Sequence, residues 1–391
     1  MIPFEKAYEI VMQTGFSTGY EIVDFTLSLN RVLAENVISD VDMPPFDKAS
    51  MDGFACRKSD LACDLAIIET IAAGSWPERQ VGKCQCSRIM TGAAVPEGAD
   101  CVVMVEDTEI LASGKVRFRG MFVKENIAKK GEDVCKGDIV LKAGKLIKPQ
   151  DVAVLASSGH TSVRVGKKPS VAVISTGNEI VEPWNIPGMS QIRNSNSYQL
   201  MAQVERSGAS GKYYGIAMDD ETATCRLVER AVSENDIVLI TGGVSMGDFD
   251  FVPAVMEKAG VRILFSRVAV QPGKPTTFGI AGEKVVFGLP GNPVSSFVQF
   301  EMLVRPLICK MMGFEWKPVE IKLPLREDFV RKSADRMAFV PVVITDDGYA
   351  SIVEFHGSGH ITSLPYSDGI ISIPSGVFKL SGGEIVNVRH I

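Results

Sequence analysis

The feature that most constrains the fold is a strand and helix alternation between residues 169 and 318. Apolar runs such as SVAVIST, IVLIT and KVVFGL alternate there with helical segments such as SYQLMAQVERSG and ETATCRLVERAVS. The strand runs are mostly apolar without a polar residue at every second position, which is typical of parallel strands covered on both faces. We therefore predict a central three-layer α/β domain with a mostly parallel sheet, and one long helix over PVSSFVQFEMLVRPLI.

The remaining segments are dominated by short β runs, so we predict a multi-domain α/β plus β fold. Residues 44–134 are β runs broken by glycine and proline, which indicate a β-rich inserted domain. After Trp316 only strands and turns remain, and we expect a small C-terminal β-barrel-like domain at 319–391. Residues 1–18 and 168–318 are assigned to the central domain, whereas 19–43 and 135–167 are assigned to a linking α+β domain. LSLNRVLAENVIS in that linker reads as a helix or a turn.

Charge and composition exclude several classes of function. The chain carries 47 acidic and 41 basic residues, a net charge of -6 that gives no footprint for nucleic acid or an anionic membrane surface. The eight cysteines lack CxxC spacing and there are four histidines, so we expect no structural zinc and reduced thiols. Neither a signal peptide nor a membrane span is predicted, and the expected location is the cytoplasm.

Four loops follow predicted strands of the α/β domain at their carboxyl ends, where open parallel sheets bind ligands. They are STGNEI, the aspartate pair at 219 and 220, TGGVSMGDFD and LPGNPVSS. Glycine-rich loops at this edge offer backbone N–H groups to an anion, and the prolines stiffen the last turn. Any one of these loops can equally be a turn that ends a strand, but the four together favour a ligand site. The candidate residues of the two glycine and proline loops are Gly242, Gly243, Gly247, Pro290, Gly291, Asn292 and Pro293.

Carboxylates on the same predicted edge suggest a hard divalent cation. Magnesium bridging phosphate oxygens needs one or two carboxylates plus waters, and Asp219 and Asp250 are our candidates for them. The alternative is that Asp248 or Asp250 caps the following helix. Lys274, in the stiff PGKP loop, can present an ammonium group to a phosphate or oxyanion, or can be a solvated turn lysine. A P-loop NTPase is disfavoured because GxxxxGK[ST] is absent.

The β insert contributes exposed polar loops of its own. Asp52 lies in MPPFDKASMDGFA, Thr91 in RIMTGAAVPEGAD and Asp133 in KKGEDV. Read alone, each is an ordinary turn. If the insert of one subunit folds over the α/β edge of another, these side chains could complete a site between two chains.

Taken together, the motifs resemble those of the molybdopterin molybdenumtransferase family, which includes the E domain of gephyrin. MPPFDKASMDGFA, MTGAAVPEGADCVVMVE, GEDV, STGNEI, IRNSNSYQL, TGGVSMGDFD, PGKP and LPGNPVSSF occur in the family's order over essentially the whole chain. The resemblance implies an elongated homodimer whose active site is shared between subunits, and a magnesium-assisted reaction in which adenylylated molybdopterin releases AMP as molybdate is inserted. It implies an active site lined by Asp52, Thr91, Asp133, Glu179, Asp219, Asp250, Lys274, Pro290 and Pro293.

Within that resemblance, roles can be assigned as hypotheses. Asp219 and Asp250 would hold magnesium, Ser245 would join Gly242 and Gly243 near the phosphates, and Lys274 would neutralise anionic charge. Glu179 and Asp52 would hold the pterin or molybdate, without a distinction between them.

Two departures from the family pattern leave the oxoanion open. Gln271 stands where many members carry lysine, and Pro341 stands near a frequent arginine position, whereas Arg336 fits another. A tungstate-inserting or non-catalytic molybdopterin-binding paralogue is therefore the alternative function, and a scaffold protein is the alternative from another class. Cofactor-receiving proteins are possible partners.

Overall fold

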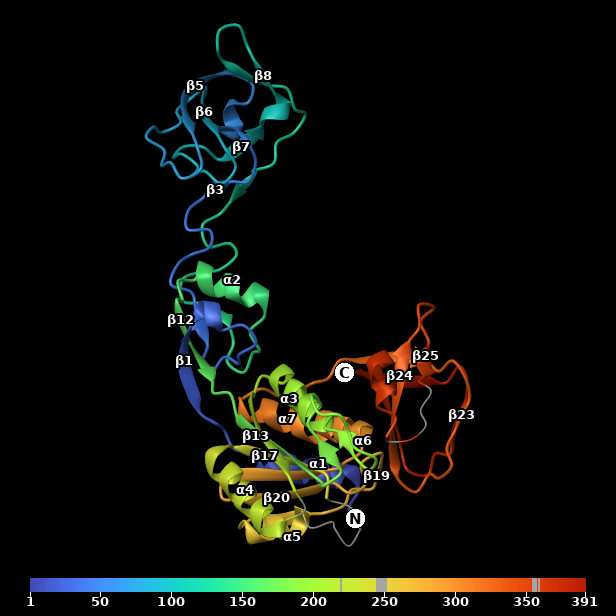
Figure 1. The fold of residues 1–391 in the computed structure, drawn as a ribbon. Coiled ribbons are helices and arrows are strands. Elements are labelled where there is room, and N and C mark those ends of the chain that lie inside the picture. The colour runs from blue at the N-terminus through green and yellow to red at the C-terminus, as the bar shows by residue number, and fades with distance from the viewer. Residues whose placement is uncertain (219, 244–251, 354–356, 358) are drawn as a thin grey trace.

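The computed structural model describes residues 1–218, 220–243, 252–353, 357 and 359–391. The molecule is elongated: the β-rich insert stands at one end, the linking segments follow, and the central sheet and the C-terminal β region lie at the other end (Figure 1). The predicted combination of an α/β unit with separate β sheets is confirmed. No helix among the described residues is both long enough and apolar enough to cross a membrane.

The central sheet has the strand order β16-β13-β17-β21-β20-β18. Its first four strands are parallel, and β20 and β18 are antiparallel to their neighbours. The sequence pattern missed β20, because TFGIA is short and separated from the next strand by a two-residue turn. In sheet order the strands are β16 (Ser210–Ala217), β13 (Ser170–Thr176), β17 (Ile237–Thr241), β21 (Lys284–Leu289), β20 (Thr277–Ala281) and β18 (Arg262–Phe265).

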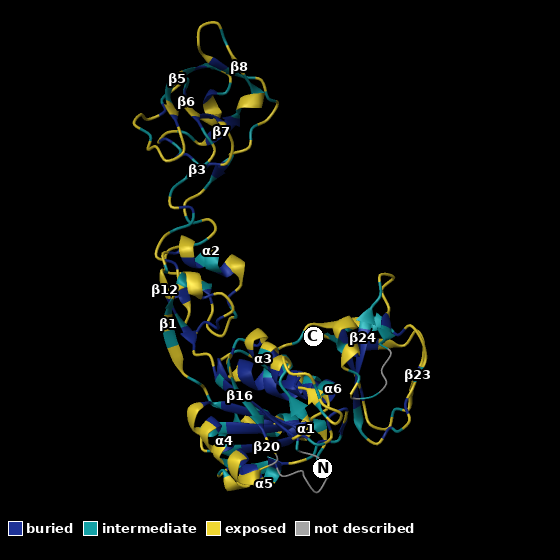
Figure 2. Ribbon diagram, in the orientation of Figure 1, coloured by how far each residue is buried: buried dark blue, intermediate teal, exposed yellow. Residues whose placement is uncertain are grey.

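Alternate residues of the central strands point into two different cores, as a period of two requires. Val171 and Val173 of β13 pack in one core with α1 (Phe4–Thr14), α3 (Asn196–Arg206) and the helices after β21. Ala172 and Ile174 pack in the other core with α4 (Glu221–Glu234) and α5 (Val252–Lys258). Figure 2 shows the buried strands between exposed helix faces. This layering leaves the carboxyl ends of the strands for the loops discussed below.

The expected single long helix after β21 is interrupted. It consists of α6 (Pro293–Gln299), the π-helical turn η4 (Phe300–Val304) and α7 (Arg305–Met311). Pro306 has no N–H to donate to the carbonyl four residues earlier, so the helix widens before it. The buried Glu301 lies in this turn, where it pairs with Arg206 and Arg305.

Two narrow antiparallel ribbons connect the central sheet to the insert. One joins β1 (Tyr20–Asp24) to β12 (Ser162–Gly166), and the other joins β2 (Val37–Ile38) to β11 (Ile139–Leu141). The helix α2 (Pro149–Ser157) packs beside them, and Asp151 accepts a hydrogen bond from the Lys148 N–H at its start. LSLNRVLAENVIS begins at the last residue of the 3-10 turn η1 (Phe25–Leu27) and continues as a turn, bends and β2, so of its two alternatives the turn is correct.

The insert is built on a six-stranded sheet with the order β7-β4-β6-β5-β9-β8. Asp60 holds two cysteines near each other: its carbonyl accepts from the Cys63 N–H and its carboxylate from the Cys84 N–H. These cysteines form a disulfide, so the expectation of reduced thiols is wrong for this pair. The sheet strands are β7 (Cys101–Met104), β4 (Gly53–Cys56), β6 (Gln85–Ile89), β5 (Asp64–Ile71), β9 (Val116–Phe118) and β8 (Thr108–Ile110), and β3 (Lys48–Ala49) pairs with β10 (Ile127–Ala128) at the base.

The C-terminal sheet incorporates one strand from the central part of the chain. β19 (Val270–Gln271) pairs in parallel with β24 (Met337–Ile344) and begins the order β19-β24-β26-β28-β22. Barrel-like closure of this region stays a prediction. The other strands are β26 (Gly369–Ile373), β28 (Ile385–His390), β22 (Glu320–Pro324), β25 (Ala350–Ile352) beside β24, and the separate pair β23 (Phe329–Val330) and β27 (Lys379–Leu380).

Candidate functional site

The loops after β13, β17 and β21 meet at one edge of the central sheet. Ser175 of β13 is in register with Thr241 of β17, and Thr241 is in register with Leu289 of β21, so the three strands end at the same level. Gly242 continues this contact, because its N–H donates to the Leu289 carbonyl at 3.2 Å. The structure therefore brings together three of the loops that the sequence pointed to.

The backbone of the loop after β17 requires glycine at two consecutive positions. Gly242 and Gly243 have φ angles of +97° and +61°, in the left-handed region that side chains disfavour. A Cβ atom on Gly242 would lie 2.5 Å from the Thr176 carbonyl oxygen, and one on Gly243 would lie 2.9 Å from Val252 Cγ2. The neighbouring chain thus leaves no room for side chains on this turn. A turn without side chains is typical of loops whose backbone N–H groups bind an anion.

A buried asparagine ties this glycine loop to the proline loop after β21. Asn196, the first residue of α3, donates through Nδ2 to Thr241 Oγ1 at 2.9 Å and to the Gly291 carbonyl at 2.7 Å. The Thr241 hydroxyl in turn donates to the Pro290 carbonyl at 3.2 Å. Residue-level reasoning missed Asn196, although the polar run IRNSNSYQL before an amphipathic helix was the available signal.

A second polar network lies under the edge strand of the sheet. Asn194 accepts from Ser175 Oγ at 3.0 Å and donates to Tyr213 OH at 2.8 Å, and Tyr213 donates to Glu182 at 2.7 Å. Burial and the hydrogen bond to Glu182 raise the pKa of Tyr213, so its hydroxyl stays protonated. Asn194 thereby fixes the segment between β15 (Ile192–Arg193) and α3, and with it the backbone of Asn196.

The PGKP loop presents Lys274 to solvent from a fixed backbone. Gln299 of α6 donates to the Pro272 carbonyl at 3.2 Å, and the Thr276 hydroxyl donates to the Gly273 carbonyl at 2.7 Å. Gly273 has a φ of +109°, and a Cβ there would lie 2.4 Å from Gln299 Nε2. Lys274 is exposed at the end of this braced turn, which suits a cation that meets an arriving anion.

Gln271, the departure from the family pattern, is exposed at a cavity of about 630 Å³ between the PGKP loop and the C-terminal sheet. Arg331 and Lys332 also line this cavity. The Arg331 guanidinium donates to the carbonyls of Pro374 and Val377 at 3.1 and 3.2 Å. Its role is therefore first structural, because it joins two segments of the C-terminal region.

Asp52 and Thr91 form a hydrogen-bonded pair on the insert. Asp52 Oδ1 accepts from the Thr91 N–H at 2.6 Å and from its hydroxyl at 2.7 Å. These bonds, the hydroxyl bond first, lower the pKa of Asp52 below its ordinary value. Both residues are exposed, so the pair presents a carboxylate oriented for contact with a ligand or another chain.

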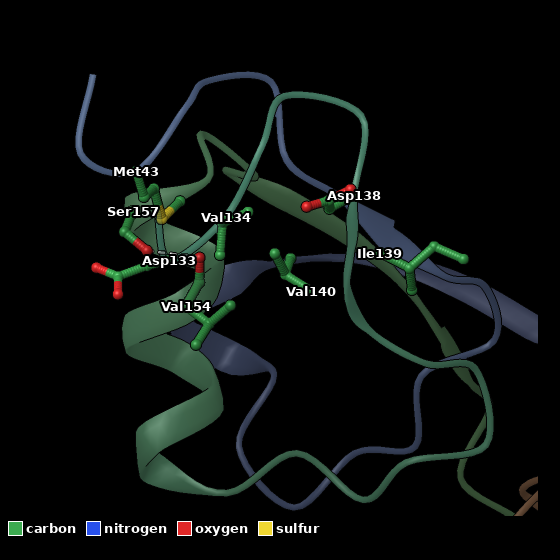
Figure 3. A pocket seen from close by; sticks show the side chains of 8 residues that line it. All are labelled: Met43, Asp133, Val134, Asp138, Ile139, Val140, Val154 and Ser157. Atoms are coloured by element: carbon green, nitrogen blue, oxygen red, sulfur yellow. Dashed lines mark hydrogen bonds between the residues drawn. The ribbon is translucent and has the colours of Figure 1, made fainter. Parts of the chain in front are cut away.

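Asp133 lies lower on the molecule, at the junction of the insert and the linking ribbons. It lines a hollow of about 500 Å³ with Met43, Asp138 and Ser157, and its carboxylate points away from Asp138 (Figure 3). Among the described residues, no hydrogen bond joins Asp133 to Asp52 or Thr91.

Several predicted site residues lie outside the described part of the chain, namely Asp219, Ser245, Gly247, Asp248 and Asp250. Glu179 is described and exposed, just after β13. Within the described ranges, no group of three histidine, cysteine, aspartate or glutamate side chains could hold a metal ion. The two carboxylates predicted for magnesium therefore stay a prediction.

This fold and site define an α/β protein whose glycine and proline loops meet at one edge of a mostly parallel central sheet. Residues 172–310 match the family model described as a probable molybdopterin binding domain. Residues 2–159 match the MoeA N-terminal region (domain I and II), and residues 322–391 match the MoeA C-terminal region (domain IV).

Similar proteins extend the match over the full chain. The molybdopterin molybdenumtransferase of Staphylococcus aureus is 37% identical, covering 99% of this chain and 95% of that protein. That of Staphylococcus epidermidis is 38% identical with the same coverage. The crystal structure of the molybdopterin biosynthesis MoeA protein from Pyrococcus horikoshii OT3 aligns with a TM-score of 0.87 and 32% identity over 100% of both chains. The chain belongs to the MoeA family of molybdopterin molybdenumtransferases.

Proposed function

We propose that this chain inserts molybdenum into adenylylated molybdopterin and releases AMP, the last step of molybdenum cofactor biosynthesis. The observation that carries the proposal is the hydrogen-bonded connection, through Thr241 and Asn196, between the Gly242–Gly243 turn and the loop from Pro290 to Pro293, at the edge where parallel sheets bind ligands. Membership in the molybdenumtransferase family supports the same reaction.

The described groups suit the cleavage of a phosphoanhydride. Charge spreads over the phosphate oxygens in the transition state, so catalysis mainly needs alignment, N–H donors and cations. The glycine turn supplies a backbone without side chains, and exposed Lys274 supplies a fixed positive charge. Asp219 and Asp250 would hold magnesium, which would supply further charge neutralisation when bound.

We propose further that the active site is shared within a homodimer. Asp52 and Thr91 are on the insert, which stands at the opposite end of the molecule from the central sheet (Figure 1). The insert is separated from the central sheet of its own chain by the linking segments (Figure 1), which supports a contact with the sheet edge of a second copy. In a two-fold dimer each insert would then complete the partner's site.

Subunit complementation tests the shared site. Asp52→Asn and Lys274→Ala proteins are each expected to release little AMP from adenylylated molybdopterin with magnesium and molybdate. After subunit exchange, the heterodimer has one site with both changes and one with neither, so an equal mixture should regain about a quarter of wild-type activity. Absence of recovery in mixtures shown to contain heterodimers would contradict sharing, and no AMP release by the wild type would exclude the enzyme.

Gln271 motivates a second candidate, insertion of tungstate. A neutral amide lining the cavity attracts an oxyanion less than lysine would, so the choice of oxoanion at this position is open to test. Parallel AMP-release assays with molybdate and tungstate, in wild type and Gln271→Lys, decide this point. Release with neither oxoanion, together with retained molybdopterin binding, would identify a non-catalytic binding paralogue.

We also propose the domain boundaries, location and partners given by the sequence. The central unit would comprise 1–18 and 168–318, with linking segments 19–43 and 135–167, the insert 44–134 and the C-terminal unit 319–391. The sheets fall within these segments apart from β19, which supports the division. A cytoplasmic enzyme would hand its product to cofactor-receiving proteins, which pull-down with molybdenum-loaded enzyme would detect.

A further inference from the structure

We propose that Asn196 is a positioning residue for the reaction proposed above, on which this inference rests. Its side-chain amide holds the glycine loop after β17 and the proline loop after β21 at a fixed spacing. The two loops would otherwise diverge where their strands end, and the alignment of their N–H groups with a phosphate would be lost.

Both amide hydrogens of Asn196 are used, one for each loop. One is donated to Thr241 Oγ1 at 2.9 Å and the other to the Gly291 carbonyl at 2.7 Å. Thr241 passes the connection on, because its hydroxyl accepts from Asn196 and donates to the Pro290 carbonyl at 3.2 Å. The start of α3, the end of β17 and the turn after β21 thus form one hydrogen-bonded unit.

This unit is buried directly beneath the candidate site. Asn196 is 8% exposed and Thr241 is 1% exposed. In such buried surroundings a hydrogen bond is protected from competing water, and it restrains the geometry of its partners more strongly than at the surface. A Cβ added to Gly291 would lie 3.5 Å from Gly242 Cα, and the Gly242 N–H donates to the Leu289 carbonyl at 3.2 Å, so the tied loops are close neighbours. A shift of either loop therefore moves the other.

Two buried oxygens indicate that the geometry is not optimised for stability alone. Asn196 Oδ1 and Thr176 Oγ1 are inaccessible and have no hydrogen-bond partner among the residues that the structure describes. Thr176 lies immediately under the glycine turn, since a Cβ on Gly243 would be 3.0 Å from its Oγ1. Leaving buried acceptors unpaired is unfavourable, and proteins tolerate it where another requirement determines the backbone. Here that requirement is the path of the two loops.

Asn235 provides a matched control for an asparagine with a purely structural role. It is 3% exposed and also donates two hydrogen bonds, to Tyr214 OH at 2.7 Å and to the Ala231 carbonyl at 2.9 Å. It precedes β17, at the opposite edge of the sheet from the loops. Asn196→Ala and Asn235→Ala therefore each remove a buried amide that donates two hydrogen bonds, at opposite ends of the strands of one sheet.

The experiment measures kcat and KM for AMP release, and the thermal unfolding temperature, for both variants. Since a misplacement of 1 Å can lower a rate about 100-fold, we expect kcat of Asn196→Ala to fall about 10- to 100-fold. We expect a much smaller change in KM, and wild-type kcat for Asn235→Ala despite a similar fall in unfolding temperature. Equal kcat values for the two variants would overturn the proposal. If the wild type itself releases no AMP, the proposed function fails first.

Two further comparisons keep the proposal testable if Asn196→Ala does not fold. Asn196→Asp keeps the size but replaces donors by acceptors, so it should lose AMP release; retained release would show that Asn196 only fills space. Thr241→Val should lower kcat for AMP release. Thr241→Ser keeps the hydroxyl and should have a kcat close to that of the wild type. If Thr241→Val is as active as Thr241→Ser, the hydrogen-bonded unit has no positioning role.

Discussion

Replacement of Gly242 by alanine is the sharpest single test of the glycine turn. At φ +97° a side chain adds conformational strain of about 1–2 kcal/mol. The new Cβ would also lie 2.5 Å from the Thr176 carbonyl oxygen, whereas real Cβ contacts essentially never fall below 3.0 Å. Because the obstacle is backbone, the turn must move by about half an ångström, and such overpacking adds about 1–3 kcal/mol.

Gly215→Ala supplies the control because it separates strain from displacement. Gly215 has a similar φ of +94°, but no atom lies within 4 Å of its ideal Cβ. In urea unfolding, the strain should lower the free energy of unfolding of both variants. Only Gly242→Ala should show a further decrease, because of the steric clash. A shift of half an ångström predicts about a tenfold fall in kcat for AMP release in Gly242→Ala alone. Equal stability and equal kcat in the two variants would refute the steric reasoning.

Three other outcomes are expected. Glu301→Ala should lower the free energy of unfolding by about 3–5 kcal/mol in urea titrations, because Arg305 then loses the buried carboxylate that it contacts at 2.8 Å; an exposed control, Glu315→Ala, should change little. Thr91→Val should raise the pKa of Asp52 toward its ordinary value in an NMR titration. In the wild type this depressed pKa stabilises the insert above the unfolded carboxylate pKa of about 3.9, and the contribution is lost as pH falls through the folded value. Removal of divalent cations with EDTA should abolish AMP release, and magnesium should restore it; full activity in EDTA would contradict metal assistance.

The strands and loops of the central sheet were predictable because their burial leaves a strong sequence pattern. SVAVIST, IVLIT and KVVFGL are mostly apolar, because nearly every residue of β13, β17 and β21 is buried between the two covered faces. Glycine after IVLIT marked a turn for a definite reason, since Gly242 and Gly243 both adopt positive φ. Local chemistry thus determined these features.

The features that local patterns did not reveal depend on contacts between distant residues. β20 is recognisable only when paired with β21, and the π-helical turn before Pro306 interrupts an apolar run that reads as one helix. The role of Asn196 depends on Thr241 and Gly291, which lie 45 and 95 residues away. Asp52 and Thr91, 39 residues apart, were both named, but their hydrogen bond required the folded insert.

The strand β19 has a mechanical consequence for the PGKP loop. Val270 and Gln271 pair with Met337 and Ala338 of the C-terminal sheet, and Arg336 donates to the Val270 carbonyl at 3.1 Å. Through these bonds the C-terminal sheet restrains the backbone that leads directly into Lys274. A rotation of that sheet would move Lys274, so if the lysine binds an anion as proposed, a mutation far out on β24 would change anion binding without contacting the ligand.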